Sequence, residues 1–249
     1  GHGIVGKILL HKFNGIRYIL DNVYGSAERR AVANCEKVNP EGFTKPMEVD
    51  EYDWKNGSPE DFYEKYVKTP KPVILRGFAK DTEAAKKWKF DYMVKTYGDE
   101  YALLSNKEKD GFPGKLKDVA GPGNYLHNSE VLFLKYPQLM KDLKLDRLEP
   151  YIKKGLGYAQ FFVGARSGTG TPFHCASNWN WFTMIDGEKT WYFVDPEYSW
   201  FIYPLAIVGR AATFAMPLYP DDFGKDCWPL SKWCPYYETT VRSGGKFTV

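Results

Sequence analysis

The chain has 249 residues, of which 17% are aromatic and 26% are charged, and its formal net charge is +3. That length can bury the core of a sizeable domain, and that proportion of charged residues argues against intrinsic disorder. Because the basic residues are scattered among acidic ones, the charge indicates no basic patch, and nucleic acid is not an expected partner.

Apolar side chains recur at helical spacing near the N-terminus, between Ile4 and Leu20. The charged residues in this stretch are all basic, so the pattern predicts a basic amphipathic helix. Such a helix can pack on its own domain, contact a partner protein or lie on a membrane surface, and these alternatives stay open. Residues Asp21 to Trp54 are predicted to form an irregular linker. Residues 1–56 are therefore interpreted as an N-terminal helix and linker.

A second helix is predicted to begin at Ser58. Serine can cap the free backbone amides, the proline that follows it fits the first helical position, and two acids come next. This helix should end before Pro70. The residues from Pro72 to Arg76 are predicted to form a short buried strand, and a further helical stretch is predicted from Thr82 to Tyr97.

The middle of the chain is predicted to be less regular. Residues 103–123 are rich in charge and glycine, which indicates loop and edge strand. Leucines indicate short helices between residues 129 and 152. From residue 157 the pattern changes to strands, so helices come first and strands second. That order favours an α+β fold.

The pair Asp186-Gly187 is a strong signal for a two-residue turn. It lies between two strand-like stretches, Trp179–Ile185 and Glu188–Val194, and therefore predicts a hairpin. In that hairpin Phe182 would face Trp191 on the partner strand. Alternation would place six side chains on one face of the hairpin: Asn180, Phe182, Met184, Lys189, Trp191 and Phe193.

Lys189 is the unusual residue of that face. If the face lies in the interior, the Lys189 ammonium is surrounded by aromatic side chains, where an ammonium without a partner is costly. It would then need an anion, either the carboxylate of a bound small molecule or an internal acid. The alternative is that Lys189 lies near the tip of the hairpin and extends its ammonium to water.

The four cysteines form no Cys-x-x-Cys pair, so a zinc site is not expected. A bridge between Cys227 and Cys234 is one interpretation of their spacing, and free thiols are the other.

The segment Gly157–Asp195 resembles the JmjC or cupin-like family of iron- and 2-oxoglutarate-dependent oxygenases. The following stretches carry the resemblance: Phe161 to Gly164, Ser167 to His174, Asn180 to Phe182, Asp186 to Trp191, and upstream Lys71 to Phe78 and Leu126 to Asn128. The resemblance implies a double-stranded β-helix, the cupin or jelly-roll barrel, preceded by helices. We assign this domain to residues 57–249 and expect it to be truncated before its last strands.

By position, the resemblance also implies roles for individual residues. His174 matches the first iron ligand. Thr171 matches a hydrogen-bonding partner of the co-substrate, and Asn180 matches a polar residue that lines the co-substrate pocket. Lys189 matches the cation that pairs with the far carboxylate of 2-oxoglutarate, which is the residue that the hairpin pattern also singles out.

Two departures from the family pattern concern the metal. The family's next ligand is a carboxylate two residues after the histidine, and this chain has Ala176 there. A methyl group cannot bind iron. The family's distal histidine has no counterpart either, because no histidine follows His174 in the sequence.

These departures favour a degenerate domain that acts as a structural or binding module in a larger assembly, with no cofactor. The alternative is an active hydroxylase that uses Fe(II) and 2-oxoglutarate, or, less favoured, a halogenase in which a halide fills the position left by Ala176. A third interpretation is that Lys189 retains an organic acid without iron. Protein partners are expected at Ile4–Leu20 and at an apolar insert, Trp200–Val208, unless that insert folds back on its own domain.

Overall fold

The structure is a computed structural model that describes most of the chain. The described residues are 14–43, 45–106, 108–109, 111–152, 159–165, 168–171, 173–175, 179–208, 211–214, 220–225, 228–243 and 246–248. They belong to two compact units, each built from stretches that are far apart in the sequence. Unit 1 is Gly1–Glu48, Thr171–Trp179 and Tyr192–Thr239, and unit 2 is Val49–Gly170, Asn180–Trp191 and Thr240–Val249.

Unit 2 contains two four-stranded sheets. The first has the order β5–β4–β6–β7 and is antiparallel throughout, with β4 at Tyr101–Ser105, β5 at Phe112–Lys115, β6 at Tyr125–Ser129 and β7 at Phe161–Gly164. The second has the order β2–β3–β14–β9, with β2 at Asp50–Tyr52, β3 at Val73–Arg76, β9 at Phe182–Thr183 and β14 at Lys246–Thr248. In this sheet β2 and β3 are parallel and the other pairs are antiparallel.

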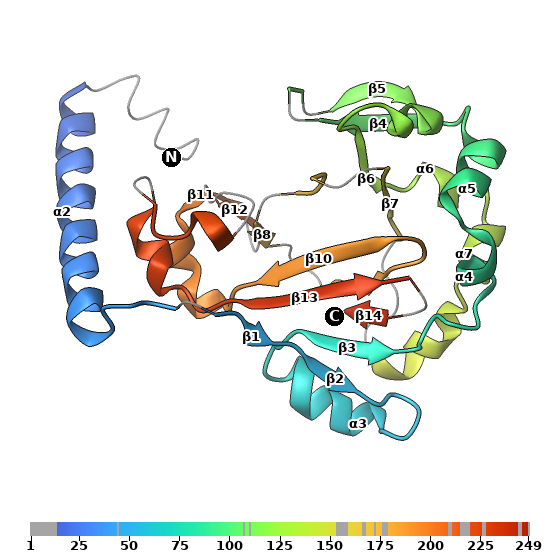
Figure 1. The fold of residues 1–249 in the computed structure, drawn as a ribbon, viewed down its shortest axis with the longest axis horizontal. Coiled ribbons are helices and arrows are strands. Elements are labelled where there is room, and N and C mark those ends of the chain that lie inside the picture. The colour runs from blue at the N-terminus through green and yellow to red at the C-terminus, as the bar shows by residue number, and fades with distance from the viewer. Residues whose placement is uncertain are drawn as a thin grey trace. The chain divides into compact units, whose positions relative to one another are not determined.

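Short helices complete unit 2. They are α3 (Pro59–Phe62), which continues into the π-helical turn η1 (Tyr63–Val67), α4 (Glu83–Lys87), α5 (Phe90–Tyr97), α6 (Val131–Lys135), α7 (Gln138–Asp142) and the 3-10 turns η2 (Leu116–Ala120) and η3 (Leu145–Tyr151). Buried side chains of α5, α6 and α7 pack with Leu104 and Leu126, so these helices cover one face of the β5–β4–β6–β7 sheet (Figure 1).

The helix start predicted at Ser58 is confirmed. The Ser58 hydroxyl accepts a hydrogen bond from the Asp61 amide at 3.1 Å, and Pro59 occupies the first helical position. The strand predicted at Pro72–Arg76 is confirmed as β3, whose first three residues are buried. The helix predicted from Thr82 to Tyr97 exists as two helices, because the chain bends at Trp88 and Lys89 between α4 and α5.

Unit 1 contains a long helix and a small sheet. The helix is α2 (Asn14–Val38), and the sheet has the order β11–β12–β8, with β8 at His174–Cys175, β11 at Pro204–Val208 and β12 at Ala211–Phe214. The 3-10 turns η4 (Pro196–Ile202), η5 (Pro220–Asp222) and η6 (Pro229–Trp233) surround a small core around Ile202 and Cys234. The remaining sheet among the described residues has the order β1–β13–β10, with β1 at Met47–Glu48, β10 at Glu188–Phe193 and β13 at Tyr237–Arg242.

The prediction of an irregular linker from Asp21 to Trp54 is wrong for its first half, because α2 continues to Val38. Residues 26–37 contain alanines, glutamates, lysine and arginines, which are good helix formers, and the first proline comes at position 40. The helix is held in unit 1 by the Tyr203 hydroxyl, which donates to Glu28 at 2.6 Å and accepts from the Leu230 amide at 3.1 Å. Most of the predicted stretch Ile4–Leu20 lies outside the described residues.

The predicted hairpin is wrong in its strand pairing. In the described residues β9 pairs with β14, whereas β10 is the neighbour of β13, so β9 and β10 belong to different sheets. Four residues, 184–187, separate the two strands. The physical reason lies at Asp186, whose carboxylate accepts hydrogen bonds from the Phe90 amide at 3.0 Å and from Lys89 Nζ at 3.1 Å and is thereby held at the start of α5.

One side-chain contact of the predicted hairpin is nevertheless confirmed. The rings of Phe182 and Trp191 pack edge to face with their centroids 4.9 Å apart. The turn residue Gly187 has φ of 83°, a conformation that glycine adopts without strain.

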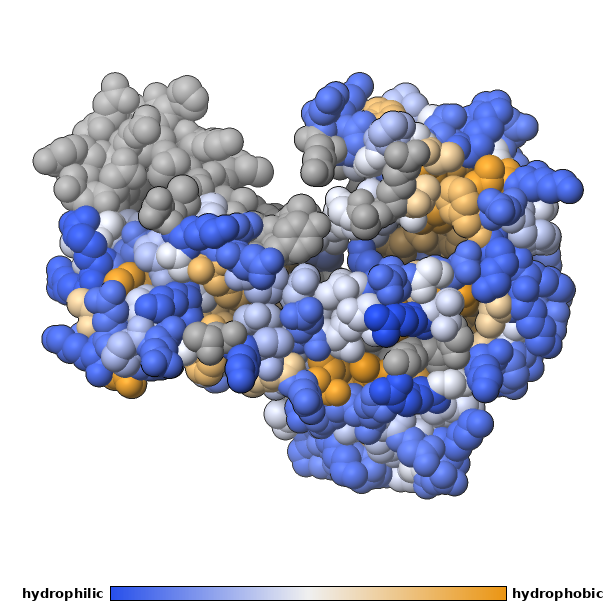
Figure 2. Space-filling view, viewed as in Figure 1, coloured by the Kyte–Doolittle hydropathy of each residue, from blue (hydrophilic) through white to orange (hydrophobic). Residues whose placement is uncertain are grey.

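The architecture of the described residues is α+β, as predicted. Their strands form four separate sheets and close into no barrel among the described residues, so the double-stranded β-helix stays a prediction, as does the domain boundary between residues 56 and 57. No helix among the described residues is both long and apolar enough to cross a membrane. The surface is largely hydrophilic in the view of Figure 2, with an apolar area at its upper right.

Candidate anion-binding site

Lys189 is half-buried in β10 and lies against an aromatic ring, as the interior interpretation of its strand face predicts. Its Nζ atom lies 5.1 Å from the centroid of the Tyr125 ring, a cation–π contact. Burial lowers the pKa of the Lys189 ammonium, and no charged group among the described residues adds to that shift. Among the described residues no carboxylate forms an ion pair with Lys189. An ammonium in this setting is a candidate site for an anion, because a buried charge is costly unless it is paired.

The aromatic ring that Lys189 contacts belongs to Tyr125 of β6. Tyr125 is 8% exposed, and burial raises the pKa of its hydroxyl to about 12. Its strand neighbour across β6 and β7 is Gly164, and a Cβ atom at Gly164 would lie 3.3 Å from the Tyr125 ring and would overlap the Thr169 hydroxyl. Only glycine leaves room at position 164 for both side chains.

The segment after β7 brings the backbone close to Lys189. A Cβ atom at Gly170 would lie 3.3 Å from Lys189 Nζ, closer than most such contacts in proteins. Lys189, Tyr125, Gly164, Thr169 and Gly170 therefore form one local cluster within unit 2, which we call the Lys189 cluster.

The strand that carries Lys189 is anchored along the edge that faces β13. The Gly187 carbonyl accepts a hydrogen bond from the Ser243 amide at 2.8 Å, and Glu188 pairs with Arg242 at 3.0 Å. The Thr190 and Thr240 hydroxyls lie 2.9 Å apart. Together with the contacts of Asp186 at α5, these bonds fix the part of β10 from which Lys189 projects.

The other predicted co-substrate residues lie in more open surroundings. Asn180 is exposed and belongs to unit 2, like Lys189. Thr171 is exposed and belongs to unit 1. The threonine that the structure places in the Lys189 cluster is Thr169. The sequence singled out neither Thr169 nor Tyr125, although the glycines at 164 and 170 mark the places where side chains approach the backbone.

The predicted iron ligand is on a short strand of unit 1. His174 is exposed and lies in the two-residue strand β8, opposite Thr213 of β12. Ala176 lies outside the described residues. No group of three or more histidine, cysteine, aspartate or glutamate side chains that could hold a metal ion occurs in the described part of the chain. Cys35, Cys175 and Cys234 form no disulfide with one another in that part, and Cys227 lies outside it.

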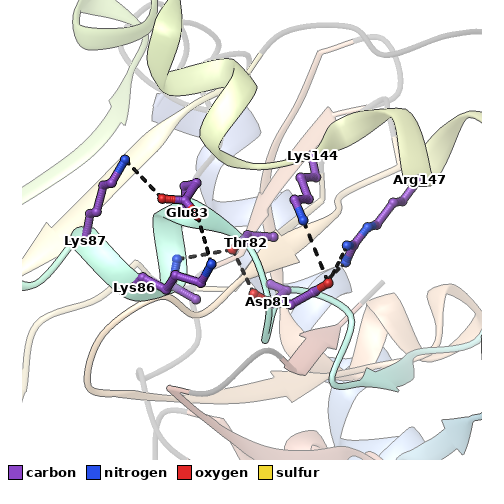
Figure 3. A network of polar contacts seen from close by, with 9 residues as sticks. Asp81, Thr82, Glu83, Lys86, Lys87, Lys144 and Arg147 are labelled. Carbon is purple, nitrogen blue, oxygen red and sulfur yellow. Dashed lines mark hydrogen bonds and ion pairs between the residues drawn. The ribbon is translucent and has the colours of Figure 1, made fainter.

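A second cluster of charged residues in unit 2 contrasts with the surroundings of Lys189 (Figure 3). Arg147 forms two hydrogen bonds of 2.7 Å with Asp81, and Lys144 Nζ lies 3.8 Å from the same carboxylate. Glu83 pairs with Lys86 and Lys87 at 2.8 and 3.0 Å. The hydrogen bonds from Arg147 and from the lysines hold the pKa of Asp81 well below its usual range and lower that of Glu83 to about 2.

This second cluster is structural. Arg147 also donates to the Phe78 carbonyl at 3.0 Å and lies over the Trp54 ring, so it connects η3 to the turn that follows β3. Thr82 caps α4 by accepting from the Ala85 amide at 3.1 Å. Both carboxylates are occupied by basic side chains, whereas the Lys189 ammonium, within the described part of the chain, contacts an aromatic ring.

The predicted contact region Trp200–Val208 is partly buried. Trp200 is 70% exposed, whereas Ile202 and Tyr203 are 3% and 7% exposed. Residues 204–208 form strand β11 and pair with β12. The first residue of the insert thus faces solvent while the next part of it joins the core of unit 1.

The comparisons with known proteins give one relationship. No family model matches the chain. Over 153 residues, 56% of this chain, it is 29% identical to a protein named arginine-specific demethylase JMJ22 from Arabidopsis thaliana. The matched part is 30% of that protein, so the chain spans about a third of the length of this relative. The similarity supports a relationship to JmjC or cupin-like proteins.

Proposed function

We propose that this chain is a non-catalytic JmjC-like domain that binds the carboxylate of a small organic acid at Lys189. One observation carries the proposal: a half-buried ammonium lies on an aromatic ring without a carboxylate partner among the described residues. A bound carboxylate would offset the cost of that burial, because charge-assisted hydrogen bonds are among the strongest in proteins. The relationship to a JmjC protein makes 2-oxoglutarate the first acid to test.

The proposal includes the double-stranded β-helix as the arrangement of the strands. The motif residues from Phe161 to Trp191 and the similarity to the Arabidopsis protein support it. A solved structure of the chain with strands that do not form two facing sheets would contradict it.

The residues of the motif do not fit an iron site of the family's type, and we derive no reaction through iron. His174 offers one imidazole, and Ala176 offers a methyl group where the family has a carboxylate. An exposed histidine on a two-residue strand is a weak metal site by itself, since three protein ligands are the usual minimum for non-haem iron.

Thermal unfolding in EDTA tests the proposal. A ligand that binds only the folded chain raises its melting temperature by mass action. We expect 2-oxoglutarate to stabilise the wild-type chain in EDTA and to have no effect on Lys189→Met, which keeps the length of the side chain without its charge. Equal stabilisation of both proteins, or of neither, would contradict the proposal.

The second candidate is an active Fe(II)/2-oxoglutarate-dependent hydroxylase, which the similarity to a named demethylase favours. Anaerobic addition of Fe(II) and 2-oxoglutarate distinguishes the two. A metal-to-ligand absorption band would support the hydroxylase, whereas its absence, together with 2-oxoglutarate binding in EDTA, would support the non-catalytic domain.

We also propose that the chain is a subunit of a larger assembly, with Trp200 in the contact. The 70% exposure of this tryptophan supports the proposal, since side chains of that size are enriched at protein interfaces. Light scattering of the purified chain without detergent tests it. A soluble monomer that shows no self-association, and that captures no partner through Trp200, would contradict it.

A further inference from the structure

Two hydrogen bonds that hold helix α2 in unit 1 lie on one side of the helix. The Glu28 carboxylate accepts from the Tyr203 hydroxyl at 2.6 Å, and the carbonyl of Asn39, just after the helix, accepts from Trp233 Nε1 at 2.7 Å. Tyr203 ends the turn that carries the exposed Trp200, since its amide donates to the Trp200 carbonyl at 3.5 Å. The helix is therefore attached to that turn by its Glu28 side.

Another side of α2 carries apolar residues that face solvent. Val23, Tyr24 and Val38 are 60%, 54% and 87% exposed, and Ala27 is exposed as well. At about 3.6 residues per turn, Val23, Ala27 and Val38 fall within about 60° of one another around the helix. Asn34 is also exposed and lies between them. We call Val23, Ala27, Asn34 and Val38 the α2 stripe.

The two edges of the α2 stripe differ in charge. One edge has Arg30 and Lys37, which are both exposed, and no carboxylate in the described part of the chain forms an ion pair with either. The other edge has Tyr24 and Glu28, and the Glu28 carboxylate is already hydrogen-bonded within unit 1. The exposed acid Glu36 lies on the opposite side of the helix from the stripe. The stripe is therefore bordered by positive charge along one edge.

An apolar stripe with a basic edge suits a partner helix that has an acidic edge. Charges beside the apolar seam of a helix pair select the partner, because opposite charges attract across the seam and like charges repel. The small side chain of Ala27 lets a second helix approach closely. A single polar residue within the seam, such as Asn34, restricts the pairing to a partner that offers it a hydrogen bond.

Two other occupants suit the α2 stripe less well. A second copy of this chain would bring another basic edge and no free acidic edge, because Glu28 is engaged by Tyr203. A lipid bilayer requires a large apolar face, whereas Ala27 and Asn34 leave the middle of the stripe with little apolar area.

We infer that the α2 stripe, with its basic edge of Arg30 and Lys37, is a docking surface for an amphipathic helix of a partner protein that has an acidic edge. This inference rests on the proposed role of the chain as a subunit of a larger assembly. It adds a second contact surface to Trp200 and the chemistry of the partner that fits it.

Fluorescence anisotropy with two labelled synthetic helices tests the inference on the whole chain. Both peptides have leucines spaced three and four positions apart, and one has glutamates along an edge of the leucine face where its twin has lysines. We expect the wild type to bind the glutamate peptide at least about tenfold more tightly than the lysine twin. The double variant Arg30→Glu/Lys37→Glu should reverse that preference.

Matched single variants locate the contact. Arg30→Glu should weaken binding of the glutamate peptide about tenfold. Arg29→Glu is the control, because it makes the same change of charge at an exposed position away from the stripe, and it should bind within about twofold of the wild type. Val23→Ser removes exposed apolar area, so it should weaken binding about fivefold and leave the melting temperature almost unchanged.

Four results would overturn the inference. They are equal binding of the two peptides by the wild type, equal effects of Arg30→Glu and Arg29→Glu, self-association of the chain that Val23→Ser abolishes, and binding to phosphatidylserine vesicles without binding to the glutamate peptide.

Failure of the inference is distinguishable from failure of the subunit proposal. If light scattering shows a complex that depends on Trp200 while neither peptide binds, the subunit proposal stands and the inference is wrong. If the chain is a monomer that captures no partner through Trp200 and binds neither peptide, both are wrong.

Discussion

Lys189 and His174 match positions of the same JmjC-like motif, yet their surroundings differ. Lys189 is half-buried, lies on the Tyr125 ring and projects from strand β10, which is held to β13 and its following turn. His174 is exposed on a strand of two residues, and an alanine stands where the motif has its next metal ligand. The surroundings of Lys189 suit an acid, whereas His174 has no carboxylate two residues after it. The lysine half and the histidine half of the matched motif therefore differ in this chain.

The largest effect that sharpens this comparison is expected at Gly164. In Gly164→Ala the new methyl group would overlap Thr169 and press on Tyr125, so we expect a loss of about 1–3 kcal/mol in the free energy of unfolding. Chemical denaturation measures it. Gly25→Ala in α2 is the control, because alanine within a helix should be neutral or stabilising by up to about 1 kcal/mol. Equal effects at both positions would show that the Lys189 cluster is not tightly packed.

The second prediction concerns Arg147, a basic residue that is paired with a carboxylate, and the change is Arg147→Ala. It removes the hydrogen bond to Phe78 and the packing on Trp54, so we expect a melting temperature lower by about 2–4 °C at pH 7. The pKa of Asp81 is lowered in the folded state, so this pair stabilises the chain above the unfolded pKa of about 3.9 and loses that contribution as the pH falls. The difference between variant and wild type should therefore shrink below about pH 4.

Lys189→Met should stabilise the folded chain, whereas Arg147→Ala should destabilise it. Without ligand, the buried ammonium is a cost, so we expect the variant to be more stable than the wild type by roughly 1 kcal/mol at pH 7, after allowance for the solvent that still reaches the side chain. The folded pKa of Lys189 is lowered, so wild-type stability should rise with pH from that value toward the unfolded pKa of about 10.4. Denaturation at several pH values should show this rise in the wild type and not in Lys189→Met.

The smallest effect is expected at His174. His174→Ala should change the free energy of unfolding by less than about 0.5 kcal/mol, since the side chain is exposed. It should also leave the affinity for 2-oxoglutarate in EDTA unchanged. A large loss of stability or of affinity would mean that the comparison between the two halves of the motif is wrong.

Local features of the fold could be predicted from the sequence, but long-range pairings could not. The cap at Ser58 depends on adjacent residues alone. Strand alternation put Lys189 on one face with Trp191 and Phe193 and left open whether its ammonium lies in the interior or reaches water. Strand β9 pairs with β14, and strand β10 lies next to β13. Both partner strands are near the C-terminus, and no local sequence pattern indicates these pairings. The hydrogen bond from the Phe90 amide of α5 to Asp186 could not be predicted either, because 96 positions separate these two residues in the sequence.

Only part of the candidate site could be predicted from the sequence. Lys189 could be identified from the motif, because the residues that mark its position are close to it in the sequence. The neighbours Tyr125 and Thr169 are brought to it by the pairing of β6 with β7 and by the absence of side chains at Gly164 and Gly170. Motif spacing indicated Thr171, which stays a prediction, and did not indicate Thr169, since it gives the order of residues and not the path of the backbone.

The most direct test of the account is the metal dependence of acid binding. Calorimetry would compare the affinity of the wild-type chain for 2-oxoglutarate in EDTA and in excess Mn²⁺. The account predicts the same dissociation constant in both, because the carboxylate is held by Lys189 and not by a metal. Binding that appears only when the metal is present would contradict it.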